Sequence, residues 1–353
     1  MKEQQLSTRI FWADLVRIAA SIGVVSLHTI ELPYTLLSTA AAHETGITVT
    51  LPHIFSLLLL LFGKTGVPLF ILLSGSLLLS IREKDSVFFH KRIKRIILPW
   101  VVWTGLFCVT KYWGDWDTLA TCIQQFFSVL SAEFTFIPVL FSLYILTPFL
   151  RVLVAHLSIK KLGLLILLWF CAISVLPFWR NSLAFPLSVD NGIVRQTISY
   201  LGYFLAGVFI TEQKLYMINK TTLKYGVFLY CLLVAGGVYI VLTIPQHWQN
   251  ILSYTSPLTI IVACATFALF STIQTRYTEW ASWIRLSAYQ MSIASFGVFF
   301  SHTLITPIVK EQVSNFLELS FSRDLAVLML TLLISFALII VVASIPKLRP
   351  YIT

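Results

Sequence analysis

The 353-residue chain is 58% hydrophobic and only 11% charged, with a mean hydropathy of +0.86. Soluble globular domains carry about 25% charged residues, so this composition excludes a soluble protein and predicts an all-α, polytopic integral membrane protein. The net charge of +10 comes from basic residues that gather in alternate loops, which is the pattern of membrane topology. No nucleic-acid partner is predicted.

Apolar segments predict about ten transmembrane helices in one helix bundle. Each segment is long enough to cross a hydrocarbon core of about 30 Å. The chain is predicted to be a single transmembrane domain, 1–353, that includes a basic cytoplasmic segment at 81–98. The predicted spans are 10–30, 53–80, 96–113, 134–155, 161–178, 196–213, 223–243, 252–271, 288–309 and 324–345.

The placement of lysine and arginine predicts the orientation of the bundle. These residues concentrate in the segments that lie on the same side as the N-terminus when the ten spans are threaded in order. Basic loops stay in the cytoplasm, so both termini are predicted to be cytoplasmic. Arg17 interrupts the start of the first span, and we therefore expect this span to be retained rather than cleaved as a signal peptide.

The first span contains two ionisable residues, Arg17 and His28. Ionisable side chains inside a membrane are costly and usually have a partner or a function. The two residues are about 16 Å apart along a helix. Eleven residues are close to three turns, so both side chains point to nearly the same side. The alternatives are an arginine that reaches the interface and a histidine hydrogen-bonded between helices.

Two acidic residues flank this pair. Asp14 lies one turn before Arg17 and is predicted to pair with it. Glu31 lies one turn after His28, where it could orient the imidazole or raise its pKa; the alternative is an exposed residue at the end of the helix.

The cytoplasmic segment 81–100, IREKDSVFFHKRIKRIILPW, alternates basic and apolar residues. On a helix, Arg92 and Arg95 are i,i+3 neighbours. One interpretation is an interfacial helix whose basic face contacts anionic lipid headgroups. The other is a phosphate-binding platform, because arginine binds phosphate groups in a bidentate manner. The two interpretations are compatible.

Lys64 and His302 lie deep in the second and ninth predicted spans. Lys64 is predicted to face the interior, where it could hold a carbonyl oxygen or a carboxylate. His302 reaches a depth close to that of His28 and is predicted to be either a functional residue or a hydrogen-bonded core histidine. The cysteines show no paired spacing, so no metal site is predicted.

Six stretches, in order along the chain, resemble the membrane-bound acyltransferase 3 family. The likeness is closest to enterobacterial common antigen and exopolysaccharide O-acetyltransferases. The stretches are DLVR…LH with its Arg-x10-His spacing at Arg17 and His28, VPLFILLSGSLLL at 67–79, FFHKRIKRIILPW at 88–100, LYILTPFLR at 143–151, YLGYFLAGVFI at 200–210 and SFGVFFSHTLI at 295–305.

The resemblance implies a multi-pass bundle in the bacterial inner membrane that takes cytoplasmic acyl-CoA, usually acetyl-CoA, as its co-substrate. The acyl group goes to a hydroxyl of a lipid-linked or polymeric envelope glycan at the outer face. By this resemblance His28 is the catalytic histidine, and Arg17, Arg92 and Arg95 neutralise the coenzyme phosphates. Imidazole titrates near neutrality and can accept the hydroxyl proton. Whether it first carries the acyl group stays open, as does the oligomeric state, a homo-oligomer included.

A transporter or exporter of envelope glycan intermediates is the alternative function, and a catalytically inactive scaffold is a third. Many transporters show repeated halves with interrupted helices. The sequence has no evident internal repeat, and the basic segment suits an anionic coenzyme better than a neutral glycan. An acyltransferase is therefore the favoured prediction.

Overall fold

The structure is all-helical throughout the described residues, as the composition predicts. The computed structural model describes residues 10–43, 49–80, 83–111, 136–177, 192–213, 219–273, 281–345, 347–348 and 351. Eight of the described helices are long and apolar enough to cross a membrane. They are α2 (Phe11–Thr29), α4 (Leu51–Leu78), the continuous helix formed by α5 (Asp85–Arg92), η1 (Ile93–Ile97) and α6 (Leu98–Lys111), α9 (Phe136–His156), α12 (Ile193–Glu212), α13 (Lys220–Thr243), α16 (Ser282–Ser314) and α17 (Phe321–Ala343).

Each of the ten predicted spans coincides with a helix, but two of these helices are short. One is α10 (Ile159–Phe170), which continues into the π-helical turn η2 (Cys171–Val175). The other is α15 (Pro257–Ser271), where 15 residues reach about 22 Å. It begins later than predicted because the Ser256 side chain caps it and proline takes its first turn.

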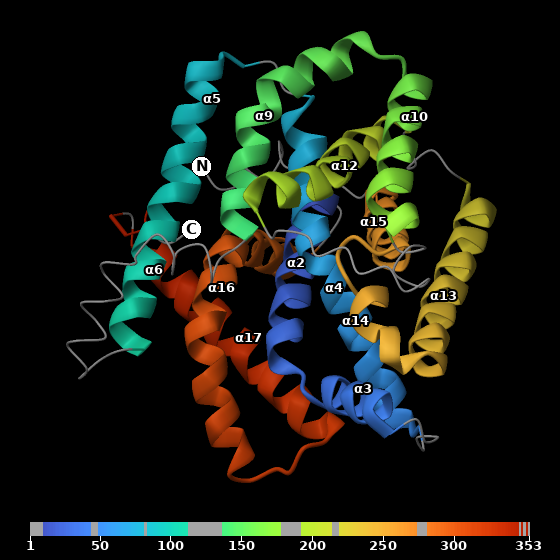
Figure 1. Cartoon of the computed structure of the whole chain (residues 1–353). Coiled ribbons are helices and arrows are strands. Elements are labelled where there is room, and N and C mark those ends of the chain that lie inside the picture. Colours follow the sequence, from blue (N-terminus) through green and yellow to red (C-terminus); the bar gives the residue numbers. More distant parts are fainter. Residues whose placement is uncertain are drawn as a thin grey trace.

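The segments around α15 and α2 contain smaller helices that the sequence prediction did not include. Before α15 come the 3-10 turn η4 (Pro245–His247) and the single turn α14 (Trp248–Ile251). A third, α3 (Leu32–His43), follows α2 directly and lies at the end of the bundle where α16 and α17 are joined (Figure 1).

Helix α4 lies at the centre of the bundle and contacts α2 along one part and α12 along another (Figure 1). Glycines make both contacts close. A Cβ at Gly23 of α2 would lie 3.1 Å from the Cα of Gly66. On the other side, Gly75 lies against the Phe204 carbonyl, and Gly207 of α12 lies against the Leu72 carbonyl. Small residues at such contacts allow membrane helices to approach closely.

Helices α2 and α16 pack side by side and run in the same direction. Residue numbers rise together along the two helices at three successive contacts. This is the relative direction that the threading predicts for the first and ninth spans. The contacts are Asp14 with Ser292, Ser21 with Ser295, and His28 with His302.

We expect Gly75→Ala to destabilise the protein by about 2 kcal/mol, because overpacking a tight interface forces the backbones apart. The added methyl group would collide with the Phe204 carbonyl of α12. The measurement is the thermal unfolding midpoint of the purified protein in detergent. Gly236→Ala on α13 is the control, since a Cβ there meets nothing within 4 Å. Equal midpoints for the two variants would contradict the close α4–α12 contact.

Candidate functional site

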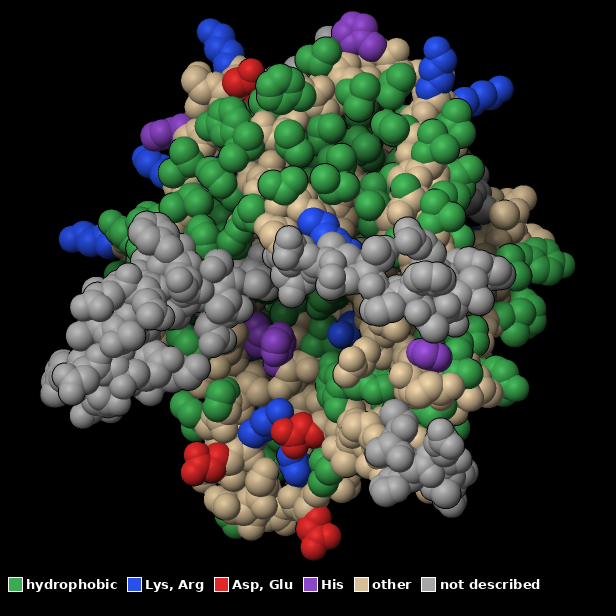
Figure 2. All heavy atoms as spheres, in the orientation of Figure 1, with side chains coloured by type: hydrophobic (Ala, Val, Ile, Leu, Met, Phe, Trp, Pro, Cys, Tyr) green, Lys and Arg blue, Asp and Glu red, His purple; other side chains and the backbone are tan. Residues whose placement is uncertain are grey.

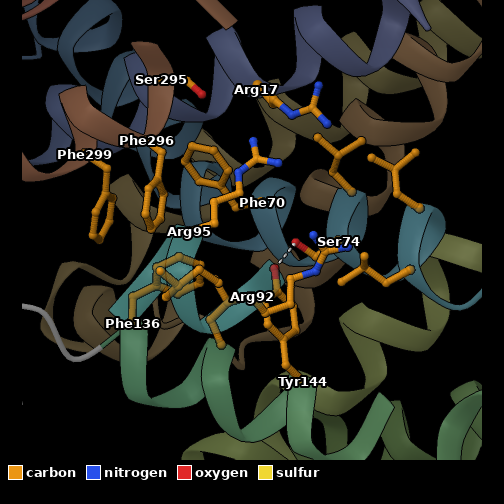
Figure 3. A pocket seen from close by; sticks show the side chains of 15 residues that line it. Arg17, Phe70, Ser74, Arg92, Arg95, Phe136, Tyr144, Ser295, Phe296 and Phe299 are labelled. Atoms are coloured by element: carbon orange, nitrogen blue, oxygen red, sulfur yellow. Dashed lines mark hydrogen bonds between the residues drawn. The ribbon is translucent and has the colours of Figure 1, made fainter. Parts of the chain in front are cut away.

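A cavity of about 250 Å³ lies among α2, α4, the α5–η1 helix, α9 and α16. Arg17, Arg92 and Arg95 all line it, so the three arginines predicted to bind phosphate come together in one place. Figure 3 shows Arg17 reaching the cavity from α2, while Arg92 and Arg95 come from the α5–η1 helix. Much of the remaining wall is apolar and includes four phenylalanines, Phe70, Phe136, Phe296 and Phe299.

Arg17 is held by a buried acidic residue, as its spacing predicts. Its guanidinium lies 2.6 Å from the carboxylate of Asp14, which is fully buried. The same carboxylate oxygen accepts a hydrogen bond of 2.5 Å from the Ser292 hydroxyl of α16. The ion pair therefore fixes the direction of Arg17 and also joins α2 to α16.

Arg92 and Arg95 lie on the stretch where α5 becomes the π-helical turn η1. The acidic Asp85 in the first turn of α5 and the basic residues in its last turn match the helix dipole. In η1 the Leu98 amide donates to the Ile93 carbonyl, and such wide turns are frequent at functional sites. Both arginines line the same cavity.

His28 and His302 face each other across the α2–α16 contact. Their ring centroids are 5.1 Å apart. His28 is exposed, whereas His302 is only 2% exposed. The predicted similarity of their depths is confirmed. Figure 2 shows histidine side chains in a hollow near the centre of the visible face.

The hydrogen bonding of His302 determines its tautomer. Its Nδ1 lies 3.1 Å from the Val298 carbonyl oxygen. A carbonyl can only accept, so Nδ1 carries the proton and Nε2 carries the lone pair. Nε2 is buried and has no hydrogen-bond partner among the described residues. His302 is therefore held in orientation by the hydrogen bond of its Nδ1.

The cavity and the histidine pair occupy two levels of the same two helices. Arg17 lines the cavity, and His28 lies about 16 Å farther along α2. On α16, Ser295 lines the cavity, and His302 lies two turns beyond it. Phe299 connects the levels, since its ring lines the cavity and its centroid is 6.1 Å from that of His302.

Glu31 lies beyond the histidines in an ion cluster between α3, α16 and α17. One carboxylate oxygen lies 2.8 Å from Lys310 Nζ, and the other pairs with Arg323. Burial acts to raise the pKa of Glu31, but the hydrogen bonds and charges of these two cations outweigh burial and lower that pKa. An orienting role of Glu31 toward His28 stays a prediction.

Asp324 completes this cluster from the first turn of α17. Its carboxylate accepts hydrogen bonds of 2.8 Å from the backbone amides of Glu31 and Leu32, and so satisfies donors at the start of α3. Acidic and basic side chains gather at this end of the face in Figure 2.

Lys64 is half-buried near the middle of α4. Its Nζ lies 5.3 Å from the centroid of the Tyr254 ring, which is the geometry of a cation–π contact. This contact gives the charge a partner within the bundle. A role in holding a substrate oxygen stays a prediction.

Two further residues beside the cavity have no role in the sequence prediction, Glu83 and Arg151. Arg151 ends the stretch LYILTPFLR, and its Nε donates a 2.9 Å hydrogen bond to the Leu78 carbonyl of α4. Glu83 precedes α5 and lies 2.7 Å from Lys91 Nζ. Arg151 contacts a different helix, and Glu83 lies outside any helix. Neither contact could therefore be predicted from helical spacing.

A family model described as an acyltransferase domain matches residues 10–344. The chain belongs to this acyltransferase family. The match runs from the start of α2 to the end of α17 and confirms the family that the motifs resemble. Together with the apolar helices, it makes the protein a multi-pass membrane acyltransferase. No curated protein sequence and no solved structure matches the chain.

We expect the Glu31 cluster to stabilise the acyltransferase at neutral pH. Because the folded-state pKa of Glu31 is lowered from 4.5, this contribution is present above pH 4.5 and is lost as the pH falls through the lowered pKa. Glu31→Gln should therefore lower the thermal midpoint at pH 7 but leave it unchanged at strongly acidic pH. The side chain is 39% exposed, so the effect at pH 7 is about 1 kcal/mol or less.

The control is Glu318→Gln, which changes an exposed carboxylate in the α16–α17 connection. It should leave the midpoint unchanged at both pH values. A Glu31→Gln deficit that persists at acidic pH would show that the carboxylate charge is not the stabilising feature.

Proposed function

We propose that this membrane acyltransferase transfers an acyl group, acetyl by preference, from cytoplasmic acyl-CoA to a hydroxyl of a cell-envelope sugar or polysaccharide. The acceptor would be lipid-linked or polymeric glycan at the outer face of the bacterial inner membrane. The observation that supports this most is the alignment of two unlike sites along α2 and α16: an arginine-lined cavity and a histidine pair beyond it.

The cavity suits an elongated anionic donor. Guanidinium groups from two walls match phosphate oxygens in charge and geometry. The phenylalanine walls offer apolar surface to the arm of a coenzyme. In this proposal Arg17, Arg92 and Arg95 hold phosphates while the arm extends past Phe299 toward the histidines.

The histidine pair suits the chemistry of acyl transfer. The hydroxyl oxygen attacks the thioester carbonyl carbon, the carbon–sulfur bond breaks, and the coenzyme leaves as a thiolate that takes up a proton. A base must accept the hydroxyl proton. We assign this task to His28, with His302 lining the reaction chamber beside it at 5.1 Å between ring centroids.

Two routes use His28 differently. In direct transfer, its imidazole removes the hydroxyl proton while the hydroxyl attacks the thioester. In the stepwise route, the imidazole first takes the acyl group and then passes it to the hydroxyl. Rapid quenching in a neutral denaturant during turnover with labelled acetyl-CoA distinguishes the two, because only the stepwise route leaves label on the protein, as an acyl-imidazole that survives briefly at neutral pH.

The acceptor is expected to approach from the end that carries α3. His28 is exposed there, and Lys64 lies within the bundle on the neighbouring helix α4. In this proposal the Lys64 ammonium group holds the carbonyl oxygen or an acidic group of the acceptor.

The first test is acyl turnover in sealed, oriented vesicles with labelled acetyl-CoA on the cytoplasmic side and an extracted lipid-linked glycan pool as acceptor. His28→Ala should lower turnover by about 10²–10⁴-fold, the usual contribution of a positioned acid–base group. His156→Ala is the control, because His156 is exposed at the end of α9. Equal turnover by His28→Ala and wild type would overturn the assignment of His28. Movement of glycan across the vesicle membrane without consumption of acetyl-CoA would favour an exporter.

The second test separates donor binding from chemistry. Arg95→Gln should raise KM for acetyl-CoA by about tenfold and change kcat little, because a charge-assisted hydrogen bond contributes about 1.5–3 kcal/mol. Lys94→Gln is the matched control, since Lys94 is exposed on the same turn and does not line the cavity. A fall in kcat with unchanged KM would contradict a phosphate-binding role for Arg95.

A further inference from the structure

Arg92 also belongs to a second basic cluster, which surrounds the carboxylate of Glu83. Lys91 Nζ is 2.7 Å from one carboxylate oxygen. A terminal nitrogen of Arg92 and a terminal nitrogen of Arg151 each lie 3.9 Å from the other oxygen. Three cations from two helices thus converge on one carboxylate.

The two arginines of this cluster both contact one buried ring. Phe88 is fully buried, and the guanidinium carbons of Arg92 and Arg151 lie 5.2 Å and 4.6 Å from its centroid. The Phe88 ring also packs edge-on against Tyr144, which lines the cavity. The cluster is therefore part of the wall that encloses the cavity.

The cluster has more donors than Glu83 can satisfy. Arg92 Nε and both terminal nitrogens of Arg151 are buried and have no hydrogen-bond partner within the described ranges. Leaving buried charged donors without partners is costly. Even when Asp85, which acts on Arg151 by its charge, is counted with Glu83, the cluster keeps an excess of positive charge.

A phosphate monoester fits this cluster better than a carboxylate does. It carries a charge of about −1.5 to −2 near neutral pH and presents three strong acceptor oxygens. Glu83 itself lies outside any helix, on the short stretch before α5, so its side chain can leave without unwinding a helix. The hydrogen bond from Lys91, and then the nearby positive charges, lower the pKa of Glu83 against the opposing effect of burial.

We propose that Lys91, Arg92 and Arg151 form a subsite for a phosphate monoester, and that the Glu83 carboxylate occupies this subsite until the ligand displaces it. The proposal rests on the proposed function, because coenzyme A carries a 3′-phosphate monoester separate from its diphosphate. Arg17 and Arg95 then serve the diphosphate, and Arg151 is a specificity residue for the 3′-phosphate.

The test is a comparison of coenzyme A and 3′-dephospho-coenzyme A binding to the purified full-length protein, measured by calorimetry in neutral detergent. Wild type should bind coenzyme A about 10-fold more tightly than the dephospho form. Arg151→Gln should remove this preference by weakening coenzyme A binding alone. Glu83→Gln should tighten coenzyme A binding, a gain that a damaged fold would not produce. Lys94→Gln is the control that should keep the preference.

Three results would overturn the proposal in distinguishable ways. If wild type binds neither ligand, the proposed function fails together with the subsite. If Arg95→Gln weakens both ligands but Arg151→Gln keeps the full preference for coenzyme A, the function stands and the subsite is wrong. If anionic lipid added to neutral nanodiscs competes with coenzyme A in wild type but not in Arg151→Gln, and the dephospho form binds equally well, the phosphate belongs to a lipid headgroup.

Discussion

The carboxylate of Asp14 sets the register on which the rest of the site depends. It is fully buried between α2 and α16, where it pairs with Arg17 and accepts a hydrogen bond from Ser292. Loss of such partners by a buried carboxylate would strongly destabilise the fold. The Asp14 contacts therefore hold α2 at one position along α16. That position places Arg17 at the cavity and His28 opposite His302. A slide of one turn, about 5.4 Å, would separate the histidines and move the arginine away from the cavity.

Phenylalanine rings connect the cavity with the histidine pair. The rings of Phe296 and Phe299 are nearly parallel, and both line the cavity, while Phe299 also packs against His302. Phe299 thus separates the arginines that line the cavity from the two imidazoles. The charged and the titratable groups thus lie at two different levels of one bundle.

The parts of the site that could be predicted from sequence are those set by helical periodicity within one helix. The Arg17–His28 spacing, the Asp14–Arg17 pair and the shared face of Arg92 and Arg95 all follow from residues per turn. The positions of Glu31 and Glu83 could not be predicted in this way. Each carboxylate is bound by cations from other helices, so its partners depend on how the helices pack. The start of α15 was also predicted too early, because an apolar run does not show where Ser256 and Pro257 start the helix.

The two ends of the bundle each contain a carboxylate bound by cations, but the charge balance differs between them. In the cluster at the α3 end, Lys310 and Arg323 face Glu31, and Asp324 binds backbone amides nearby, so the cluster itself contains two acids and two bases. At the α5 end three cations surround Glu83, and Arg92 and Arg95 extend the positive charge to the cavity. An excess of one sign in a low-dielectric cleft attracts ligands of the opposite sign. The excess of positive charge at the α5 end therefore favours an anionic ligand there, whereas the charges within the Glu31 cluster balance one another.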